Sequence, residues 1–488
     1  MVNMPLVKAG IVAVSRDCFP MSLSESRRAA LVKECAARGI DVYEVKTTVE
    51  SETDAVAALK ELRDNGVNAL VLFLGNFGPE GPETYIVQEF RGPAMVAAAA
   101  EETVAAAGRG DAFCGLLNCS YNLGLRGVSA VIPERPVGSA AELAAEIQKF
   151  IPVARALIGV RAMKIFSFGP RPYDFLACNA PLKPLYDLGV TVMENSELDL
   201  FAAYKAHDGD KRIDAVTQDM AKELGSSPYT GILPRLAQYE LTLLDFMEKN
   251  LGYCEFGVFA NKCWPAFQTE FRFVPCFVNA RLASRGIPVA CETDIYGALS
   301  EYIITLVTGK PATLLDINNT VPPAMAANAP GYQASDLFMG FHCGNTAACY
   351  LRKPVMGYQQ IMKRSLEPDG EPDITRGTLE GDFIAGPVTL FRLQANASGV
   401  LKSYIAQGEI LDMETGSFGG IGVIAVPELA RFYRHVLVGG RFPHHAGVAF
   451  AHAGEALFET VKALGVADIG FNQPKGVLYP SENPFASL

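Results

Sequence analysis

The stretch GIPVACETDIYGALSEYIITLVTGKPATLLD, residues 286–316, carries the pattern of a strand, a helix and a second strand. Residues 286–291 form a short apolar run, and apolar side chains then recur at helical spacing until Gly309, which is placed to end the helix. Residues 311–316 are again apolar, up to a final aspartate. This pattern predicts a strand–helix–strand unit of an α/β protein.

Two acids follow the predicted strands of this unit, Glu292 after the first and Asp316 after the second. If the two strands are parallel, their carboxyl ends lie on one edge of a sheet, which is where α/β proteins bind ligands. The two carboxylates would then share a site, and a cation with a preference for oxygen ligands would relieve their repulsion. The alternative is that Glu292 caps the helix and Asp316 starts a turn.

The same alternation of strands and helices extends over the first 160 residues. We expect strands at residues 8–15, 40–45 and 67–75 and helices at residues 24–39, 51–66 and 94–108, the last of which is rich in alanine. Apolar runs separated by amphipathic helices predict a parallel sheet that is covered on both faces.

The alternation resumes at residues 161–169 and then changes character. Further strands are expected at residues 190–196 and 252–260, with one long helical stretch at 212–250. Residues 377–416 are runs of period two interrupted by glycines, which predict antiparallel strands.

We therefore predict an α/β protein with two doubly wound parallel-sheet domains followed by a β-rich, antiparallel, barrel-like C-terminal domain. The expected domains are residues 1–160, residues 161–310 with Glu292, and residues 311–488 with Asp316 and a histidine-rich loop.

Composition narrows the class of protein. The 488 residues are 49% hydrophobic and 19% charged, which is typical of globular proteins. The net charge of −11 argues against a nucleic-acid partner. No apolar run reaches the roughly 18 residues of a membrane helix, so no membrane partner is expected. The N-terminus lacks the pattern of a signal peptide. The eleven cysteines contain no CxxC pair, so we expect reduced thiols and a cytoplasmic protein.

A histidine near the two acids would favour a particular cation, because imidazole shifts the preference of a carboxylate site from Mg²⁺ toward Mn²⁺. His444 and His445 are adjacent in a segment flanked by glycine and proline that we predict to be a loop, and His342 lies in another predicted loop. A single histidine is most often structural, whereas an adjacent pair in a loop is harder to explain in that way.

Several segments resemble the L-fucose isomerase family, which is related to the L-arabinose isomerases. The resembling segments are VSRDCFP (14–20), ANKCWPAFQ (260–268), ACETDIYGALSEYI (290–303), GKPATLLDINN (309–319), HCGN (342–345), GPVTLFRL (386–393) and GGRFPHHAGVAF (439–450). They occur from residue 14 to residue 450, so the resemblance covers nearly the whole chain.

The resemblance implies an intramolecular oxidoreductase of the aldose–ketose isomerase type that interconverts two forms of a free sugar through a cis-enediolate. It implies a divalent metal, usually Mn²⁺, with Mg²⁺ or Co²⁺ as alternatives, held by Glu292, Asp316 and His445. Glu292 and Asp316 are also the implied acid/base pair. The family further implies a homo-oligomer, either a trimer or a hexamer.

Four more residues match family positions less closely. His342 corresponds to an additional metal ligand in the arabinose branch, and His444 is the neighbour of the matched histidine. Arg16 fits an arginine that such enzymes send toward the site. Trp264 could stack on a sugar face or serve as a core anchor.

The sugar stays open at this point: D-arabinose, L-arabinose and a sulfonated or phosphorylated hexose are alternatives to L-fucose. A sugar-binding protein without turnover on the same fold is a further alternative.

Overall fold

The computed structural model describes residues 3–480 and 482–485. The chain divides into two compact units. One contains Val160–Val461 and the segment from Val466 onward, and the other contains Pro5–Gly159 and Lys462–Gly465. The predicted boundary at residue 310 lies inside the first of these units. No helix in the described ranges is long and apolar enough to span a membrane.

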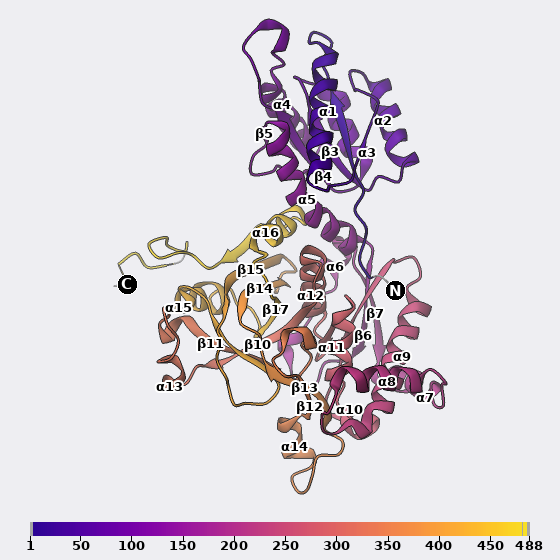
Figure 1. The fold of residues 1–488 in the computed structure, drawn as a ribbon, viewed down its shortest axis with the longest axis vertical. Helices are drawn as coiled ribbons and strands as arrows, with labels where there is room; N and C mark the ends of the chain where they lie inside the picture. The colour runs from indigo at the N-terminus through magenta and orange to yellow at the C-terminus, as the bar shows by residue number, and fades with distance from the viewer. Residues whose placement is uncertain (1–2, 481, 486–488) are drawn as a thin grey trace. The chain divides into compact units, whose positions relative to one another are not determined.

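The unit around Pro5–Gly159 is built on a parallel five-stranded sheet with the strand order β2-β1-β3-β4-β5 (Figure 1). The strands are β1 Ala9–Val14, β2 Val42–Glu44, β3 Ala69–Leu74, β4 Ala94–Ala99 and β5 Val137–Gly138. The helices are α1 Met21–Ala37, α2 Glu52–Asp64, α3 Glu80–Phe90, α4 Ala112–Leu125 and α5 Ala140–Arg161. The alternation predicted from the sequence is therefore confirmed in this unit.

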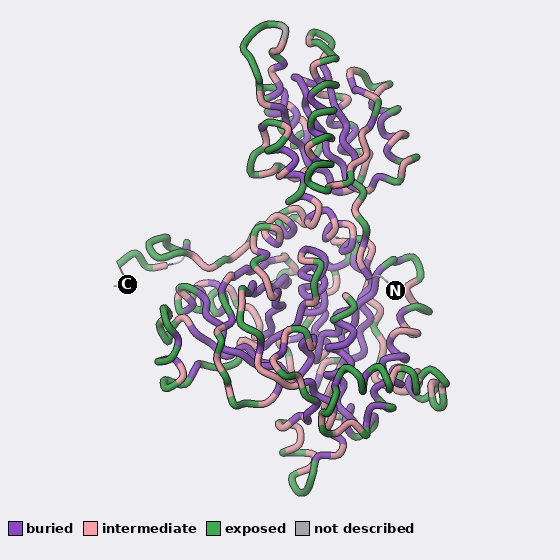
Figure 2. The backbone as a smooth tube through the Cα atoms, in the orientation of Figure 1, coloured by how far each residue is buried: buried purple, intermediate pink, exposed green. Residues whose placement is uncertain are grey.

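Helices cover both faces of this sheet, because successive side chains of a strand point to opposite sides. Val12 and Val14 pack in one cluster with residues of α2, α3 and α4. Ile11 and Ala13 pack in another cluster with residues of α1 and α5. The three central strands β1, β3 and β4 are buried throughout, whereas the edge strand β2 is half-buried (Figure 2).

The prediction of a helix at residues 94–108 is wrong. Residues Ala94–Ala99 form the buried strand β4, and only a short 3₁₀ turn, Ala106–Gly108, follows before α4. Alanine favours helices by intrinsic propensity, but burial on both faces of the sheet outweighs that preference.

The other unit begins with a second parallel sheet, which has the strand order β7-β6-β8-β9. Its strands are β6 Met163–Gly169, β7 Thr191–Ser196, β8 Phe256–Asn261 and β9 Val289–Cys291. Its helices are α6 Lys183–Asp187, α7 Glu197–Ala206, α8 Ile213–Leu224, α9 Leu233–Asn250, α10 Ala266–Phe271, α11 Cys276–Ser284 and α12 Ile295–Thr308. The single helical stretch predicted at 212–250 is thus two helices, because Gly225 adopts a positive φ at the end of α8.

The same unit contains a large mixed sheet, mostly antiparallel, with the order β12-β13-β16-β11-β10-β17-β14-β15-β18. An additional pairing of β15 with β16 closes six of these strands into a ring, as expected for a barrel-like β region. The strands are β10 Ala312–Thr320, β11 Leu337–His342, β12 Val355–Tyr358, β13 Arg376–Asp382, β14 Gly386–Ala395, β15 Leu401–Ile410, β16 Gly420–Ala425, β17 His445–Ala449 and β18 Asp468–Phe471. The helices are α13 Pro323–Ala326, α14 Gln360–Leu366, α15 Leu429–Phe432 and α16 Gly454–Ala463, with a π-helix at Tyr433–Val438. The predicted fold class is confirmed by these three sheets.

The strands on either side of α12 do not form the parallel pair considered from the sequence. β9 belongs to the parallel sheet, whereas β10 pairs antiparallel with β11 and β17 in the mixed sheet. α12 packs against strands of both sheets, and every one of its residues except Thr308 is buried. A helix that is apolar all round can be buried in this way between two sheets.

A buried carboxylate joins α12 to two strands of the mixed sheet. Asp294 is the N-cap of α12, and its Oδ1 accepts a hydrogen bond of 2.8 Å from the backbone N–H of Gly297. Its two oxygens also accept hydrogen bonds of 2.6 and 2.8 Å from the guanidinium of Arg392 on β14. Its Oδ2 lies 2.8 Å from Nδ1 of His445, the first residue of β17. Asp294 is 1% exposed and Arg392 0%.

We expect Arg392→Met to lower the free energy of unfolding by about 3–5 kcal/mol, because it leaves Asp294 as a buried charge without its guanidinium partner. Arg212→Met, which removes an arginine that is 51% exposed beside Asp210 and Asp245, should cost less than about 1 kcal/mol. Urea denaturation measures both values. The double variant Arg392→Met/Asp294→Asn should be more stable than Arg392→Met alone, since asparagine still caps the helix but carries no charge. Equal stability of the two would contradict this explanation.

Candidate metal centre

Glu292 reaches the site from a strained turn at the end of β9. Glu292 and the next residue, Thr293, both adopt φ +61°, a left-handed conformation that costs of order 1 kcal/mol or more in a residue other than glycine. The turn ends at Asp294, which caps α12. The capping role considered for Glu292 therefore belongs to Asp294, and the side chain of Glu292 is free to face the mixed sheet.

Asp316 and His445 come from neighbouring strands of the mixed sheet. They are directly opposite each other in the antiparallel pair of β10 and β17, and directly opposed residues project their side chains to the same face. Asp316 therefore lies within β10 and not past its end. His445 begins β17 and is not in a loop, and His342 is the last residue of β11. The predicted loop positions of these two histidines are corrected accordingly.

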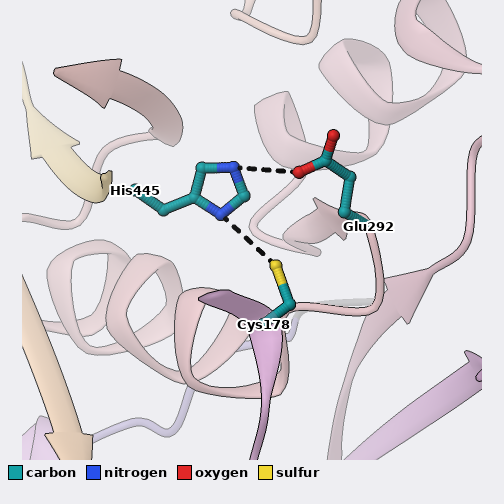
Figure 3. Close-up of side chains that lie close together, drawn as sticks. All are labelled: Cys178, Glu292 and His445. Atoms are coloured by element: carbon teal, nitrogen blue, oxygen red, sulfur yellow. Dashed lines mark hydrogen bonds and ion pairs between the residues drawn. The ribbon is translucent and has the colours of Figure 1, made fainter. Parts of the chain in front are cut away.

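Together with the turn after β9, these two strands bring an imidazole close to two carboxylates. Nε2 of His445 lies 3.3 Å from Oε2 of Glu292 and 3.4 Å from Oδ1 of Asp316. Figure 3 shows the imidazole of His445 directed at the carboxylate of Glu292. Around an octahedral ion with bonds of about 2.1 Å, neighbouring ligand atoms are about 3.0 Å apart. Each of these two nitrogen–oxygen spacings is close to that value. Among the described residues, the ligand atoms that all lie within 4.8 Å of one another form two groups that share His445, one with Cys178 and Glu292 and the other with Asp316 and His444.

The same three atoms are buried and have no hydrogen-bond partner: Oε2 of Glu292, Oδ1 of Asp316 and Nε2 of His445. Nδ1 of His342 is a fourth such atom, and its ring centroid lies 6.1 Å from that of His445. Buried polar atoms are normally paired, because leaving them unpaired costs free energy. Two carboxylates with imidazoles are the ligands that suit Mn²⁺ and related divalent cations, so these residues fit such a cation.

Asp294 fixes the orientation of the His445 ring. Because an ionised carboxylate only accepts hydrogen bonds, Nδ1 of His445 carries the proton and Nε2 faces the other two acids. The Sγ of Cys178 lies 3.9 Å from the same Nδ1 (Figure 3), at the end of a 3₁₀ turn, Leu176–Cys178. Asp294 and Cys178 therefore lie on the Nδ1 side of the imidazole, away from Glu292 and Asp316.

The charges of the cluster depend on one another. Burial raises the pKa of Glu292 and of Asp316, but the imidazole of His445 beside them outweighs burial and holds both pKa values below their usual range. Burial lowers the pKa of His445, yet the hydrogen bond to Asp294 and the neighbouring carboxylates of Asp316 and Glu292 raise it well above the usual value. Burial keeps the pKa of His342 low. Without a cation, the proton on His445 therefore balances the negative charges, and a cation bound at this point would replace that proton.

Of the other residues predicted for the site, His444 and Trp264 lie beside the cluster, whereas Arg16 lies in the other compact unit. His444 lies beside the cluster, with Nε2 3.6 Å from Oδ1 of Asp316. Trp264 is half-buried and donates a hydrogen bond of 3.0 Å from Nε1 to Oε1 of Glu292, so it lies in the wall of the site. Arg16 belongs to the other compact unit, where it lies 3.7 Å from Glu80 and over the ring of Phe77.

A cavity of about 290 Å³ opens onto the two carboxylates, which is near the lower end of the size range of small-molecule sites. Aromatic side chains and amides form much of its wall, namely Phe175, Trp264, Phe341, Gln268, Asn318 and Gln359. None of the described residues that line it is an arginine or a lysine. The cavity therefore presents rings, amides and acids to a ligand.

Reasoning from the sequence missed Asp294, Arg392 and Cys178. Asp294 stands just before the helical spacing begins, which is the usual position of a capping aspartate. Arg392 is a single charge within the apolar strand sequence VTLFRL, which indicates a buried ion pair. No sequence signal identifies Cys178, whose position depends on how the 3₁₀ turn packs.

Comparison with known proteins gives two family matches and a set of curated relatives. The description "Fucose/sulfoquinovose isomerase, N-terminal domain" matches residues 10–161, and "L-fucose isomerase, C-terminal domain" matches residues 340–470. The sulfoquinovose isomerase of Clostridium sp. (strain MSTE9) is 33% identical over 175 residues, 35% of this chain and 34% of that relative.

Two further relatives carry the same name and match longer stretches. The sulfoquinovose isomerase of Alkalicoccus urumqiensis is 26% identical over 258 residues, 52% of each chain. That of Priestia megaterium (strain ATCC 12872 / QMB1551) is 22% identical over 317 residues, 65% of this chain and 66% of the relative. The matches thus span between about a third and two thirds of the length of these relatives. The resemblance found in the sequence motifs is confirmed, and the chain belongs to the L-fucose isomerase-like family.

Proposed function

We propose that this chain is a divalent-metal-dependent aldose–ketose isomerase that acts on a free sugar. The observation that carries the proposal is a set of three buried atoms without hydrogen-bond partners. Oε2 of Glu292 and Oδ1 of Asp316 lie 3.3 and 3.4 Å from Nε2 of His445, and both acids line the cavity. Membership of the L-fucose isomerase-like family supports the same activity. Glu292, Asp316 and His445 would hold the cation, with His342 and His444 as further candidates.

Isomerisation moves one proton between C1 and C2 of the sugar and another between their oxygens, through a cis-enediolate. A bound divalent cation would supply Lewis acidity where negative charge develops on the two oxygens. Glu292 and Asp316 flank one point from opposite sheets, so one carboxylate can take a proton from one carbon and return it at the other. The hydrogen bond from Trp264 holds Oε1 of Glu292 and leaves Oε2 directed at the centre. A hydride shift between the two carbons is the alternative route.

A neutral sugar is the first candidate substrate. The aromatic rings and amides of the wall suit the faces and hydroxyls of a sugar. Arg171, whose guanidinium would suit an anionic substrate, lines a different cavity of about 510 Å³ with Asn195 and Thr293.

A sulfonated hexose is the second candidate, because the curated relatives are named sulfoquinovose isomerase. Its sulfonate would need a cationic partner from outside the described lining of the cavity.

The proposed enzyme also has a preferred cation, a cellular location and an oligomeric state. Mn²⁺ is the preferred cation, since the ligand set combines carboxylates with imidazole, and Mg²⁺ and Co²⁺ are the alternatives. The protein is proposed to be a cytoplasmic homo-oligomer, a trimer or a hexamer, with a sugar as its small-molecule partner.

A panel of aldoses and sulfonated aldoses assayed with Mn²⁺ and with EDTA tests the activity. We expect turnover of at least one sugar. EDTA treatment should lower this turnover at least tenfold and added Mn²⁺ should restore it, because negative charge that develops on two sugar oxygens beside two carboxylates needs a cation to stabilise it. Product formation is followed by chromatography. Turnover that EDTA leaves unchanged would contradict the role of a metal. Sugar binding without turnover across the panel would favour a binding protein.

We expect Glu292→Gln and Asp316→Asn each to lower kcat about a thousandfold or more, because each change removes a proton-transferring carboxylate and a ligand oxygen. The substitutions are close in size, so circular dichroism should be unchanged. Asp336→Asn, in a 3₁₀ turn that does not line the cavity, is the matched control. Near-normal kcat in either site variant would refute the assignment.

Metal content distinguishes the proposed ligand His445 from His452, whose imidazole contacts a backbone carbonyl. His445→Ala should purify with at least tenfold less metal than wild type, because it removes the nitrogen placed between the two acids. His452→Ala should retain normal metal, since Nε2 of His452 lies 3.1 Å from the carbonyl of Gly408. Metal analysis after dialysis measures both, and equal metal content would exclude His445 as a ligand.

A further inference from the structure

A second cavity, of about 510 Å³, lies at the carboxyl edge of the parallel sheet in the larger unit. Its wall includes residues at the ends of β6 and β7, whereas residues that follow β8 and β9 line part of the cavity at the metal centre. The strand order places β7 on one side of β6 and β8 on the other. Open parallel sheets bind ligands outside the carboxyl ends of their strands, where the strand order reverses in this way. The cavity therefore has the position of a ligand site, and its volume is within the usual range of such sites.

Polar residues of β6 and β7 line this cavity. Ser167 is paired with Glu194 in the register of the two parallel strands, and Gly169 is paired with Ser196. Successive side chains of a strand point to opposite faces of the sheet, so these four positions share one face. Gly169 adds no side chain there, and a Cβ at this position would approach Cγ2 of Thr293 to 3.0 Å. A larger residue would therefore narrow the cavity beside Thr293.

Arg171 supplies the one cationic side chain among the described residues that line the cavity. It follows β6, and its Nε is buried without a hydrogen-bond partner. A guanidinium only donates hydrogen bonds, and a buried donor that lacks an acceptor costs free energy. A carboxylate or a phosphate can accept two parallel hydrogen bonds from a guanidinium. An anion in the cavity would therefore supply the missing acceptor.

Other groups in the wall suit hydroxyls. The amide of Asn195 donates hydrogen bonds of 3.2 and 3.0 Å to the carbonyls of Ser167 and Met193, which leaves its Oδ1 as an acceptor. Glu194 and Asn179 also line the cavity and are exposed. Carboxylate and amide oxygens accept hydrogen bonds from hydroxyls, whereas Glu194 would repel a second anionic group. The wall therefore favours a molecule with one anionic group and several hydroxyls.

This cavity is separate from the metal centre but adjoins it. Cys178 lines the cavity, and its Sγ lies 3.9 Å from Nδ1 of His445, whereas Glu292 lies on the Nε2 side of the ring (Figure 3). Thr293 also lines the cavity and follows Glu292 in the strained turn. Neither Glu292 nor His445 is part of the wall. An occupant would therefore contact the neighbours of both residues without reaching their metal-binding atoms, as an effector would and a substrate would not.

We propose that this cavity is a second binding site, which takes a small hydroxylated molecule and pairs its carboxylate or phosphate group with Arg171. The occupant is distinct from the sugar that the proposed isomerase would convert. Binding at this site does not depend on turnover, so its test stands apart from the test of the proposed function.

Calorimetric titration of the full-length protein with glucose 6-phosphate, gluconate and glucose tests the proposal. We expect at least one of the two anions to bind, and glucose to bind at least tenfold more weakly, because glucose lacks the group that pairs with the guanidinium. The anion that binds more tightly shows whether the site takes a phosphate or a carboxylate. Binding of glucose as tight as that of both anions, or binding of neither anion, would overturn the proposal.

Substitutions at Arg171 locate the site. Arg171→Met removes the guanidinium, so the affinity for the preferred anion should fall at least tenfold. Arg171→Lys keeps the charge without the paired donors and should bind with intermediate affinity. Arg212→Met is the matched control, since Arg212 is 51% exposed in the same unit, pairs with Asp210 and Asp245, and does not line the cavity.

Glu292→Gln separates this site from the cavity at the metal centre. It should leave the affinity for the anion unchanged, because Glu292 lines the other cavity. Circular dichroism checks the folding of each variant. Loss of anion binding in Glu292→Gln, or normal binding in a folded Arg171→Met, would place the anion elsewhere and refute the proposal.

Discussion

The structure of the larger unit depends on the ion pair between Asp294 and Arg392. Both side chains are fully buried, and each would be costly without the other. The carboxylate also caps α12 and accepts a hydrogen bond from His445. The contacts of Asp294 therefore hold the start of α12 against β14 and β17 of the mixed sheet. Any shift of these elements would leave a buried charge unpaired. The same ion pair therefore stabilises the fold and fixes the position of His445 in the candidate site.

The geometry of the candidate metal centre follows from this constraint. The imidazole of His445 has one nitrogen held by Asp294, and the other is thereby directed at Glu292 and Asp316. Glu292 is held from the opposite side by a strained turn and by the indole of Trp264. Rigid support of this kind keeps ligand atoms in place before any ligand arrives. In the proposed isomerase, the adjoining cavity would then orient the sugar.

Local sequence patterns predicted much of this structure, and the errors have physical causes. Alternating apolar runs and helices identified the first parallel sheet, and Gly309 was correctly placed at the end of α12. The alanine-rich strand β4 was missed because burial between helices outweighs propensity. Glu292 and Asp316 do lie close to a common imidazole, but the proposed reason was wrong: they come from different sheets that pack on one helix. Contacts between sheets leave no periodic signal in the sequence, and for the same reason the partner of Arg392 could not be predicted.

The origin of the ligand atoms in two separate sheets has a thermodynamic consequence. Glu292 follows a strand of the parallel sheet, whereas Asp316 and His445 lie on strands of the mixed sheet. A cation bound by all three would act as a cross-link that exists only in the folded chain, so its binding free energy would add to folding stability. Removal of the ion would then loosen the seam between the sheets as well as stop turnover, and the apoprotein would be the more readily cleaved by proteases.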